Sequence, residues 1–184
     1  MEAHSALLVM DMQASIVKMN PISTLVPHVV QAISHARQHN IPVIFVVVSF
    51  RPGMPEVHPN NAMFSSSKQR MAGVDMEQFS KIEDPLTPLP GDIVVTKHRV
   101  SAFAGTDLEL VLRSLSIQHL ILTGFATSGV VLSTLREGAD KDFKLTVLSD
   151  CCADADEEVQ QVLMKKVFPR QAKVVELNEW IKLE

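Results

Sequence analysis

Near its amino end the chain carries the stretch Ala6-Leu7-Leu8-Val9-Met10-Asp11-Met12-Gln13, in which a carboxylate follows five apolar residues directly. A continuous apolar run of this length is typical of a strand that is covered on both faces of a parallel sheet. Five more short runs rich in β-branched and aliphatic residues follow along the chain, at residues 43–48, 93–95, 120–122, 145–148 and 174–175. The sequence therefore predicts six strands.

Between these runs, apolar residues recur at helical spacing. One set is Leu25, Val29, Ile33 and Ala36, a second is Leu108, Val111, Leu112 and Leu115, and a third is Val159, Val162, Leu163 and Val167. Thr106 with Glu109 predicts a capping box at the start of the second helix, and Asp154 or Asp156 an N-cap for the third. Strands that alternate with helices predict a three-layer α/β/α fold, with a six-stranded, mostly parallel, Rossmann-like sheet and helices on both faces. The 184 residues are the size of one domain, which we place at 1–184.

Composition narrows the classes of function. The net charge is −4 and no basic stripe occurs, which argues against nucleic acid as a partner. No apolar run approaches the ~20 residues of a membrane span, so we expect no membrane partner. The two cysteines are adjacent, which suits a reducing compartment, and the first residues lack the positive segment of a signal peptide. We therefore expect a cytoplasmic protein that binds a small molecule.

We expect the functional residues at the strand ends, because ligands of parallel sheets bind beyond the carboxyl ends of the strands. Asp11 follows the first strand, where burial would suit it to acid or base work, although it could equally cap the next helix. Lys97 ends the third run and, by strand alternation, points away from His98. Close to Asp11, Lys97 would favour the ionised carboxylate, but Lys97, His98 and Arg99 could equally form an exposed basic loop. Arg51 follows the second strand and could clamp a carboxylate, or simply be a solvated loop residue.

The fourth strand runs into Thr123-Gly124-Phe125-Ala126-Thr127-Ser128-Gly129-Val130-Val131, a strand–turn–helix junction with two glycines. Backbone N–H groups in such a turn can bind an anion or an oxyanion. The stretch is neither a nucleophile elbow nor a phosphate-binding loop. Ser128 is a weak candidate nucleophile without an obvious base. Cys151 and Cys152 have no cation beside them in the sequence, so we expect them to act as small hydrophobic residues.

Four of these segments in this order resemble the isochorismatase-like hydrolase family, also called the cysteine hydrolases. They are 6–13, 97–108, 124–134 and 146–153. The resemblance implies a six-stranded parallel sheet and hydrolysis of small amides, ureides or the vinyl ether of isochorismate. The amidases of this family use an Asp, a Lys and a Cys, and the first two match Asp11 and Lys97.

The third residue does not match. The family motif G-x-x-T-x-x-C-V-x-x-T falls on Gly124, Thr127, Val131 and Thr134, and places Val130 at the position of the nucleophilic Cys. A valine cannot attack a carbonyl, so a thioester route should be lost. The Asp-x-His metal motif of the nicotinamidases is also missing, and we predict no metal and no cofactor. The predicted site consists of Asp11, Lys97 and Val130, with substrate contacts from Gln13, Arg51, Phe103, Ala126, Thr127, Ser128 and Gly129.

Three functions compete. The first is a hydrolase of a small carboxylate or amide-type metabolite that uses Asp11 as general acid or base, with Lys97 beside it and no Cys. The second is a catalytically inactive relative that binds a small molecule or a protein. The third is nucleophilic catalysis by Ser128. True isochorismatases, which belong to the same family, also lack the Cys, and their reaction needs an acid rather than a covalent nucleophile.

The resemblance carries two further expectations about structure. It implies a cis peptide near Ala126-Thr127 and a homodimer or homotetramer. Several Met and Phe residues between positions 54 and 79 lie in a segment with little helix or strand pattern. They indicate an interface or a lid, or else a loop folded onto its own core.

Overall fold

All six predicted runs lie in strands of one parallel sheet in the computed structural model, which describes residues 4–20 and 22–183. The strand order is β3-β2-β1-β4-β5-β6, and every pairing is parallel. The strands are β1 (Ser5–Met10), β2 (Val43–Val48), β3 (Ile93–Lys97), β4 (His119–Phe125), β5 (Lys144–Ala153) and β6 (Lys173–Val175). The predicted six-stranded α/β fold is confirmed.

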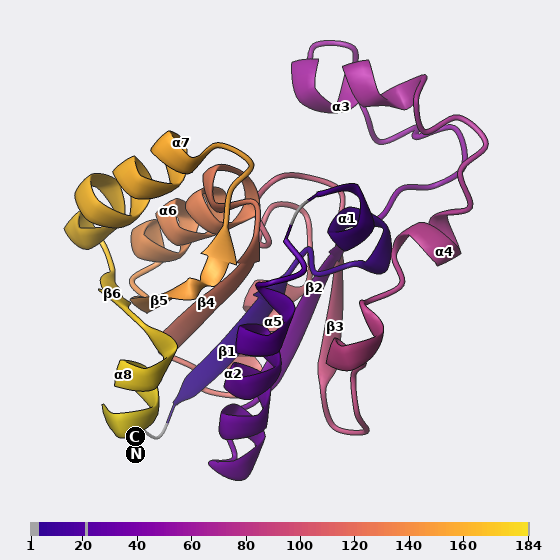
Figure 1. Cartoon of the computed structure of the whole chain (residues 1–184). Coiled ribbons are helices and arrows are strands. Elements are labelled where there is room, and N and C mark those ends of the chain that lie inside the picture. The colour runs from indigo at the N-terminus through magenta and orange to yellow at the C-terminus, as the bar shows by residue number, and fades with distance from the viewer. Residues whose placement is uncertain (1–3, 21, 184) are drawn as a thin grey trace.

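Helices cover both faces of the sheet (Figure 1). One face packs against α2 (Val26–Gln38) and α8 (Leu177–Leu183), and the other against α5 (Leu108–Ser114), α6 (Leu132–Asp140) and α7 (Glu157–Val162). The remaining short helices are α1 (Ala14–Met19), α3 (Ala62–Lys68), α4 (Met76–Phe79), η1 (Asp84–Leu86), η2 (Thr127–Val131), η3 (Leu163–Val167) and η4 (Phe168–Arg170). None of the described helices is long and apolar enough to cross a membrane.

Burial on both faces explains why the apolar runs of the central strands are continuous rather than alternating. Every residue of β1, β2 and β4 is buried, because helices cover both sides of the sheet there. By contrast, β3 is an edge strand and alternates, with Val95 and Lys97 buried and Val94 exposed. Lys97 therefore lies on the sheet face of Val95, the face that packs against α5 and α6.

β1 and β4 are neighbours at the centre of the sheet, where the strand order reverses. Such a switch point opens a crevice at the carboxyl ends of the strands. Gly124 of β4 passes so close to β1 that a Cβ on it would lie 2.0 Å from the Met10 carbonyl oxygen, and its φ is +131°. Only glycine fits this approach of the two strands.

The helix starts confirm one local prediction and correct another. Asp156 caps α7 by accepting hydrogen bonds from the Glu158 and Val159 amides, as predicted. The prediction of a capping box at the start of α5 is wrong. Thr106 Oγ1 does accept from the Leu108 amide at 3.2 Å, but the Glu109 carboxylate lies 2.6 Å from Lys141 Nζ instead of returning to Thr106. A nearby lysine from α6 offers that carboxylate a stronger partner than a backbone amide.

The connection between β2 and β3 forms a projection, residues 50–81, which we call the arm. It carries α3 and α4, and it stands off from the body of the molecule at the end where the strands terminate (Figure 1). Phe50, Met54 and Val57 form a small cluster at its base with Val48 of β2. This cluster is separate from the two main cores.

We expect Gly124→Ala to lower the free energy of unfolding by ~3 kcal/mol or more, because the new methyl group would displace the β1 backbone. Gly91→Ala is the matched control. Gly91 also has a positive φ, +103°, but a Cβ there meets nothing within 4 Å, so only backbone strain of about 1 kcal/mol remains. Urea unfolding of both variants measures the difference. Equal losses would contradict the close approach at Gly124.

Candidate active site

The site is organised around an ion pair between Asp11 and Lys97. Lys97 Nζ lies 2.9 Å from Asp11 Oδ2, and the two side chains are 3% and 11% exposed. Because β2 separates β1 from β3, the lysine reaches across the end of β2 to meet the carboxylate. Lys97 Nζ also donates to the Arg99 carbonyl at 3.1 Å, which fixes the ammonium from a second direction.

The backbone holds Asp11 in an unusual conformation. Its φ is +55°, in the left-handed region that non-glycine residues rarely adopt. Its amide donates to the Val46 carbonyl at 2.8 Å, so the chain stays bonded to β2 as it leaves the strand. Asp11 therefore does not cap α1; the N-cap position of that helix is Gln13.

Burial dominates the electrostatics of Asp11. It raises the pKa of the carboxyl from 3.8 to about 6, although the charge and hydrogen bond of Lys97 act in the opposite direction. Asp11 Oδ1 is buried and makes no hydrogen bond to any described residue. A carboxyl oxygen that is buried but unpaired is costly unless a ligand or a proton satisfies it.

The turn after β4 supplies a second unpaired group. Thr127 is fully buried, and its Oγ1 has no hydrogen-bond partner among the described residues. The cis peptide of this turn joins Phe125 to Ala126, one bond before the expected place. Val130, which the resemblance aligns with the family Cys, is 2% exposed and packs in the core cluster on the α5–α6 side of the sheet.

Part of the expected anion hole is already occupied. The Ser128 amide donates to Asp154 Oδ2 at 2.6 Å, and the Gly129 amide donates to the Ala126 carbonyl at 3.0 Å. These two N–H groups are therefore committed to the protein. Ser128 itself is exposed.

Neither cysteine has the properties of a nucleophile. Both lie in β5 and are buried, and burial raises the pKa of the Cys152 thiol to about 12 and that of Cys151 further. Cys152 Sγ faces the Leu122 carbonyl at 3.7 Å. A thiol with so high a pKa yields almost no thiolate near neutrality.

Three predicted substrate contacts are placed differently. Gln13 is fully buried. Its Nε2 donates hydrogen bonds to the carbonyls of Val48 and Phe79, and its Oε1 accepts one from the Val48 amide. Phe103 is a core residue that stacks on Phe143 at 5.8 Å. Arg51 has a 66% exposed side chain, 3.7 Å from Glu56, and lines a hollow in the arm rather than the space beside Asp11.

The structure adds residues that the sequence did not single out, because their contacts join distant segments. Arg99 donates to the carbonyls of Glu56 and His98, which ties the first end of the arm to the residues after Lys97. The second end is bonded beside Asp11. There Gln13 Nε2 donates to the Phe79 carbonyl at 2.7 Å, and the Ala14 amide donates to Lys81. Both ends of the arm thus lie next to the ion pair.

Within the described ranges, no three His, Cys, Asp or Glu side chains gather closely enough to hold a metal ion. The ion pair itself offers a buried carboxyl with a raised pKa and an adjacent ammonium, and the turn after β4 adds the buried Thr127 hydroxyl. These groups can transfer a proton and bind an oxygen atom of a substrate.

Comparison with known proteins identifies the family. Residues 5–179 match the family described as the isochorismatase domain. The isochorismatase family protein YwoC of Bacillus subtilis (strain 168) is 28% identical over 177 residues, which are 96% of this chain and 92% of YwoC. The chain therefore belongs to the isochorismatase family and is one of its hydrolases, so the inactive alternative is not favoured.

Solved structures agree with this assignment. A cysteine hydrolase from Pseudomonas syringae pv. phaseolicola 1448A superposes with a TM-score of 0.88, over 98% of this chain and 92% of that one; at 22% identity it supports the fold alone. N-carbamoylsarcosine amidase from Thermoplasma acidophilum is 25% identical, with a TM-score of 0.79, over 95% of this chain and 97% of that one.

We expect Gln13→Leu to lower the free energy of unfolding by about 2–4 kcal/mol, because it leaves the Val48 amide and carbonyl and the Phe79 carbonyl without their partner. Urea unfolding measures the loss. Gln161→Leu on the exposed side of α7 is the control and should change stability by less than ~0.5 kcal/mol. A small effect at Gln13 would mean that solvent or a substrate contact replaces these bonds.

Proposed function

We propose that this protein hydrolyses a small carboxylate or amide-type metabolite through Asp11 and Lys97, without a covalent Cys intermediate. The observation that carries the proposal is the buried Asp11 carboxyl, with one oxygen 2.9 Å from Lys97 Nζ and the other without a hydrogen-bond partner among the described residues. Its raised pKa of about 6 makes it a proton donor that is still populated near neutrality. The position of Val130 supports a route without a nucleophile.

In this mechanism, written for a vinyl ether, the protonated Asp11 gives its proton to the terminal vinyl carbon, which leaves the carbon that bears the ether oxygen electron-poor. A water molecule adds to that carbon and returns a proton to the Asp11 carboxylate. The resulting hemiketal breaks its ether C–O bond as its hydroxyl proton passes to the leaving oxygen, which yields a ketone and an alcohol. The Lys97 ammonium stabilises the carboxylate that remains and can hold a substrate oxygen. The Thr127 hydroxyl binds a second polar atom of the substrate in this proposal, because it is buried and has no hydrogen-bond partner among the described residues.

The chemistry suits a vinyl ether better than an amide. Protonation of a vinyl ether followed by addition of water needs an acid and no nucleophile, whereas the cysteine route to amide hydrolysis needs a thiolate that Val130 cannot supply. Amides nevertheless belong in the assay, since one solved relative is an amidase. Ser128 is the second candidate nucleophile, but it is exposed and its amide is held by Asp154. A cytoplasmic location also stays a prediction.

Asp11→Asn should reduce kcat by ~10²–10⁴, because an amide cannot donate the proton that Asp11 supplies. The assays are pyruvate release from isochorismate and ammonia release from small N-carbamoyl amides, with purified wild-type protein. Cys152→Ala is the control and should keep wild-type kcat, since Cys152 is a buried strand residue. Ser128→Ala should also keep activity. Turnover that survives Asp11→Asn, or that depends on Ser128, would contradict the mechanism.

The pH profile tests the role of Asp11 as an acid. The protonated form is required, so kcat/KM should be level below about pH 6 and fall tenfold per pH unit above it. A limb that rises through pH 6 would instead identify Asp11 as a base.

Lys97→Met removes the cation that opposes the effect of burial, so the pKa of Asp11, followed by carboxyl ¹³C NMR, should rise above 6.

A further inference from the structure

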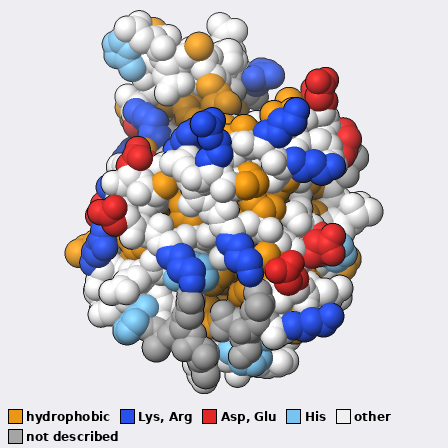
Figure 2. Space-filling model, turned by 90° about the vertical axis from the view of Figure 1, so that its left-hand side faces the viewer, with side chains coloured by type: hydrophobic (Ala, Val, Ile, Leu, Met, Phe, Trp, Pro, Cys, Tyr) orange, Lys and Arg blue, Asp and Glu red, His pale blue; other side chains and the backbone are white. Residues whose placement is uncertain are grey.

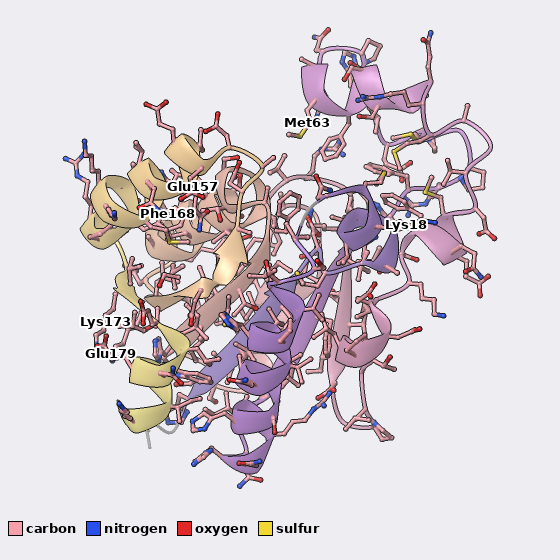
Figure 3. The ribbon with its side chains drawn as sticks, viewed as in Figure 1. Lys18, Met63, Glu157, Phe168, Lys173 and Glu179 are labelled. Carbon is pink, nitrogen blue, oxygen red and sulfur yellow. The ribbon has the colours of Figure 1, made fainter. Side chains whose placement is uncertain are left out.

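The arm is packed as a unit of its own and stands off from the body, as Figures 1 and 2 show from perpendicular directions. Phe50, Met54 and Val57 form its small core, and further Phe and Met side chains of the arm pack against them. Met63, on α3, is 57% exposed and projects from the helix without packing on the body (Figure 3). The placement of the arm relative to the sheet therefore depends mainly on contacts near its two ends.

The Arg99 side chain makes the contact at the first end of the arm. Its Nη1 donates to the His98 carbonyl at 2.6 Å, and its Nη2 donates to the Glu56 carbonyl of the arm at 2.8 Å. Within residues 4–20 and 22–183 this guanidinium makes no ion pair, so both of its hydrogen-bond partners are neutral backbone groups. A guanidinium presents its N–H groups in a rigid planar fork. Arg99 therefore joins the arm to the segment after β3 through geometry rather than through charge.

The backbone of Arg99 holds the Lys97 ammonium. The Arg99 carbonyl accepts a hydrogen bond from Lys97 Nζ at 3.1 Å, and Asp11 Oδ2 lies 2.9 Å from the same nitrogen. Ser49, which follows β2, braces the start of this segment. Its amide donates to the Lys97 carbonyl at 3.1 Å, and its carbonyl accepts from His98 Nδ1 at 2.5 Å. Residues 97–99 are thus anchored to the end of β2 and, through the Arg99 side chain, to the arm.

Two of the three N–H groups of the Lys97 ammonium are engaged, one by Asp11 and one by the Arg99 carbonyl. The third makes no hydrogen bond to any described residue. Because two partners fix the ammonium, the third N–H keeps one direction and can hold a substrate oxygen there. A reacting group that shifts by about an ångström loses much of its effect on the rate.

We propose that Arg99 is a positioning residue: it bonds the Glu56 carbonyl of the arm and thereby fixes the backbone whose own carbonyl orients the Lys97 ammonium. This inference rests on the function proposed for Asp11 and Lys97, and it makes the arm part of the support of that site. The Arg99 side chain makes no ion pair with Asp11 among the described residues, and the charge that opposes burial at Asp11 is that of Lys97. An effect of Arg99 on Asp11 must therefore be transmitted through Lys97.

The test compares Arg99→Met and Arg99→Lys with the control Arg136→Met. Methionine removes both hydrogen bonds, whereas lysine keeps the charge but loses the planar fork. Arg136 is an exposed arginine of α6 whose Nη1 donates to Gln171 Oε1, so the control removes the same charge from the surface of the protein. Carboxyl ¹³C NMR follows the pKa of Asp11, and ¹⁵N NMR follows the Lys97 ammonium. Neither measurement needs turnover.

In both Arg99 variants the Lys97 ammonium should lose its fixed position, and its N–H signals should be lost to fast exchange with water. The pKa of Asp11 should rise above the wild-type value of about 6, because a displaced Lys97 opposes the effect of burial less. With a substrate that the wild type hydrolyses, kcat should fall about 10–100-fold in Arg99→Met. Arg136→Met should match the wild type in all three measurements.

An Asp11 pKa that stays at the wild-type value or falls in Arg99→Met would overturn the proposal. So would an Arg99→Lys variant that matches the wild type, because the charge alone would then suffice. Urea unfolding checks that each variant is folded, and if Arg99→Met is not, the comparison of Arg99→Lys with the wild type decides. Loss of turnover in Asp11→Asn with unchanged NMR signals in the Arg99 variants would refute the positioning role alone. Shifted NMR signals in a protein without turnover would support that role and count against the proposed function.

Discussion

The buried contact between Lys97 and Asp11 is the constraint on which the rest of the site depends. Two charges are held out of water at 2.9 Å, an arrangement that is stable only if the geometry is tight and other hydrogen bonds complete it. The sheet supplies that geometry, since β1 and β3 end on either side of β2. The Lys97 ammonium also donates a hydrogen bond to the Arg99 carbonyl. Burial raises the pKa of this carboxyl to about 6, and among the described residues only one of its two oxygens has a hydrogen-bond partner.

The arm is connected to that pair at both of its ends. Arg99 binds the Glu56 carbonyl on the side of Lys97, and Gln13 binds the Phe79 carbonyl on the side of Asp11. Both ends of the arm are therefore joined by hydrogen bonds to the segments that hold Asp11 and Lys97.

The resemblance aligns Val130 with the nucleophilic Cys of the amidases, and among the described residues neither cysteine lies in the turn after β4. The two cysteines lie in β5, buried and with raised pKa values, and the Ser128 amide is bound by Asp154. The Asp11 carboxyl and the Lys97 ammonium are the groups on which our proposed function rests, in which proton transfer, rather than covalent attack, opens the substrate to water.

The sequence by itself determined the six strands and the position of Asp11, because unbroken apolar runs such as 6–10 and 43–48 can be buried only in a covered parallel sheet. Alternation predicted that Lys97 and His98 point to opposite sides, but only the structure shows that Lys97 is the buried one of the two. Only the tertiary structure decided the roles of Gln13 and Phe103, the pairing of Glu109 with Lys141, and the exposure of Arg51. The physical reason is that strand and helix patterns arise from neighbours along the chain. By contrast, the partner of a polar side chain is chosen among groups that folding brings from dozens of residues away.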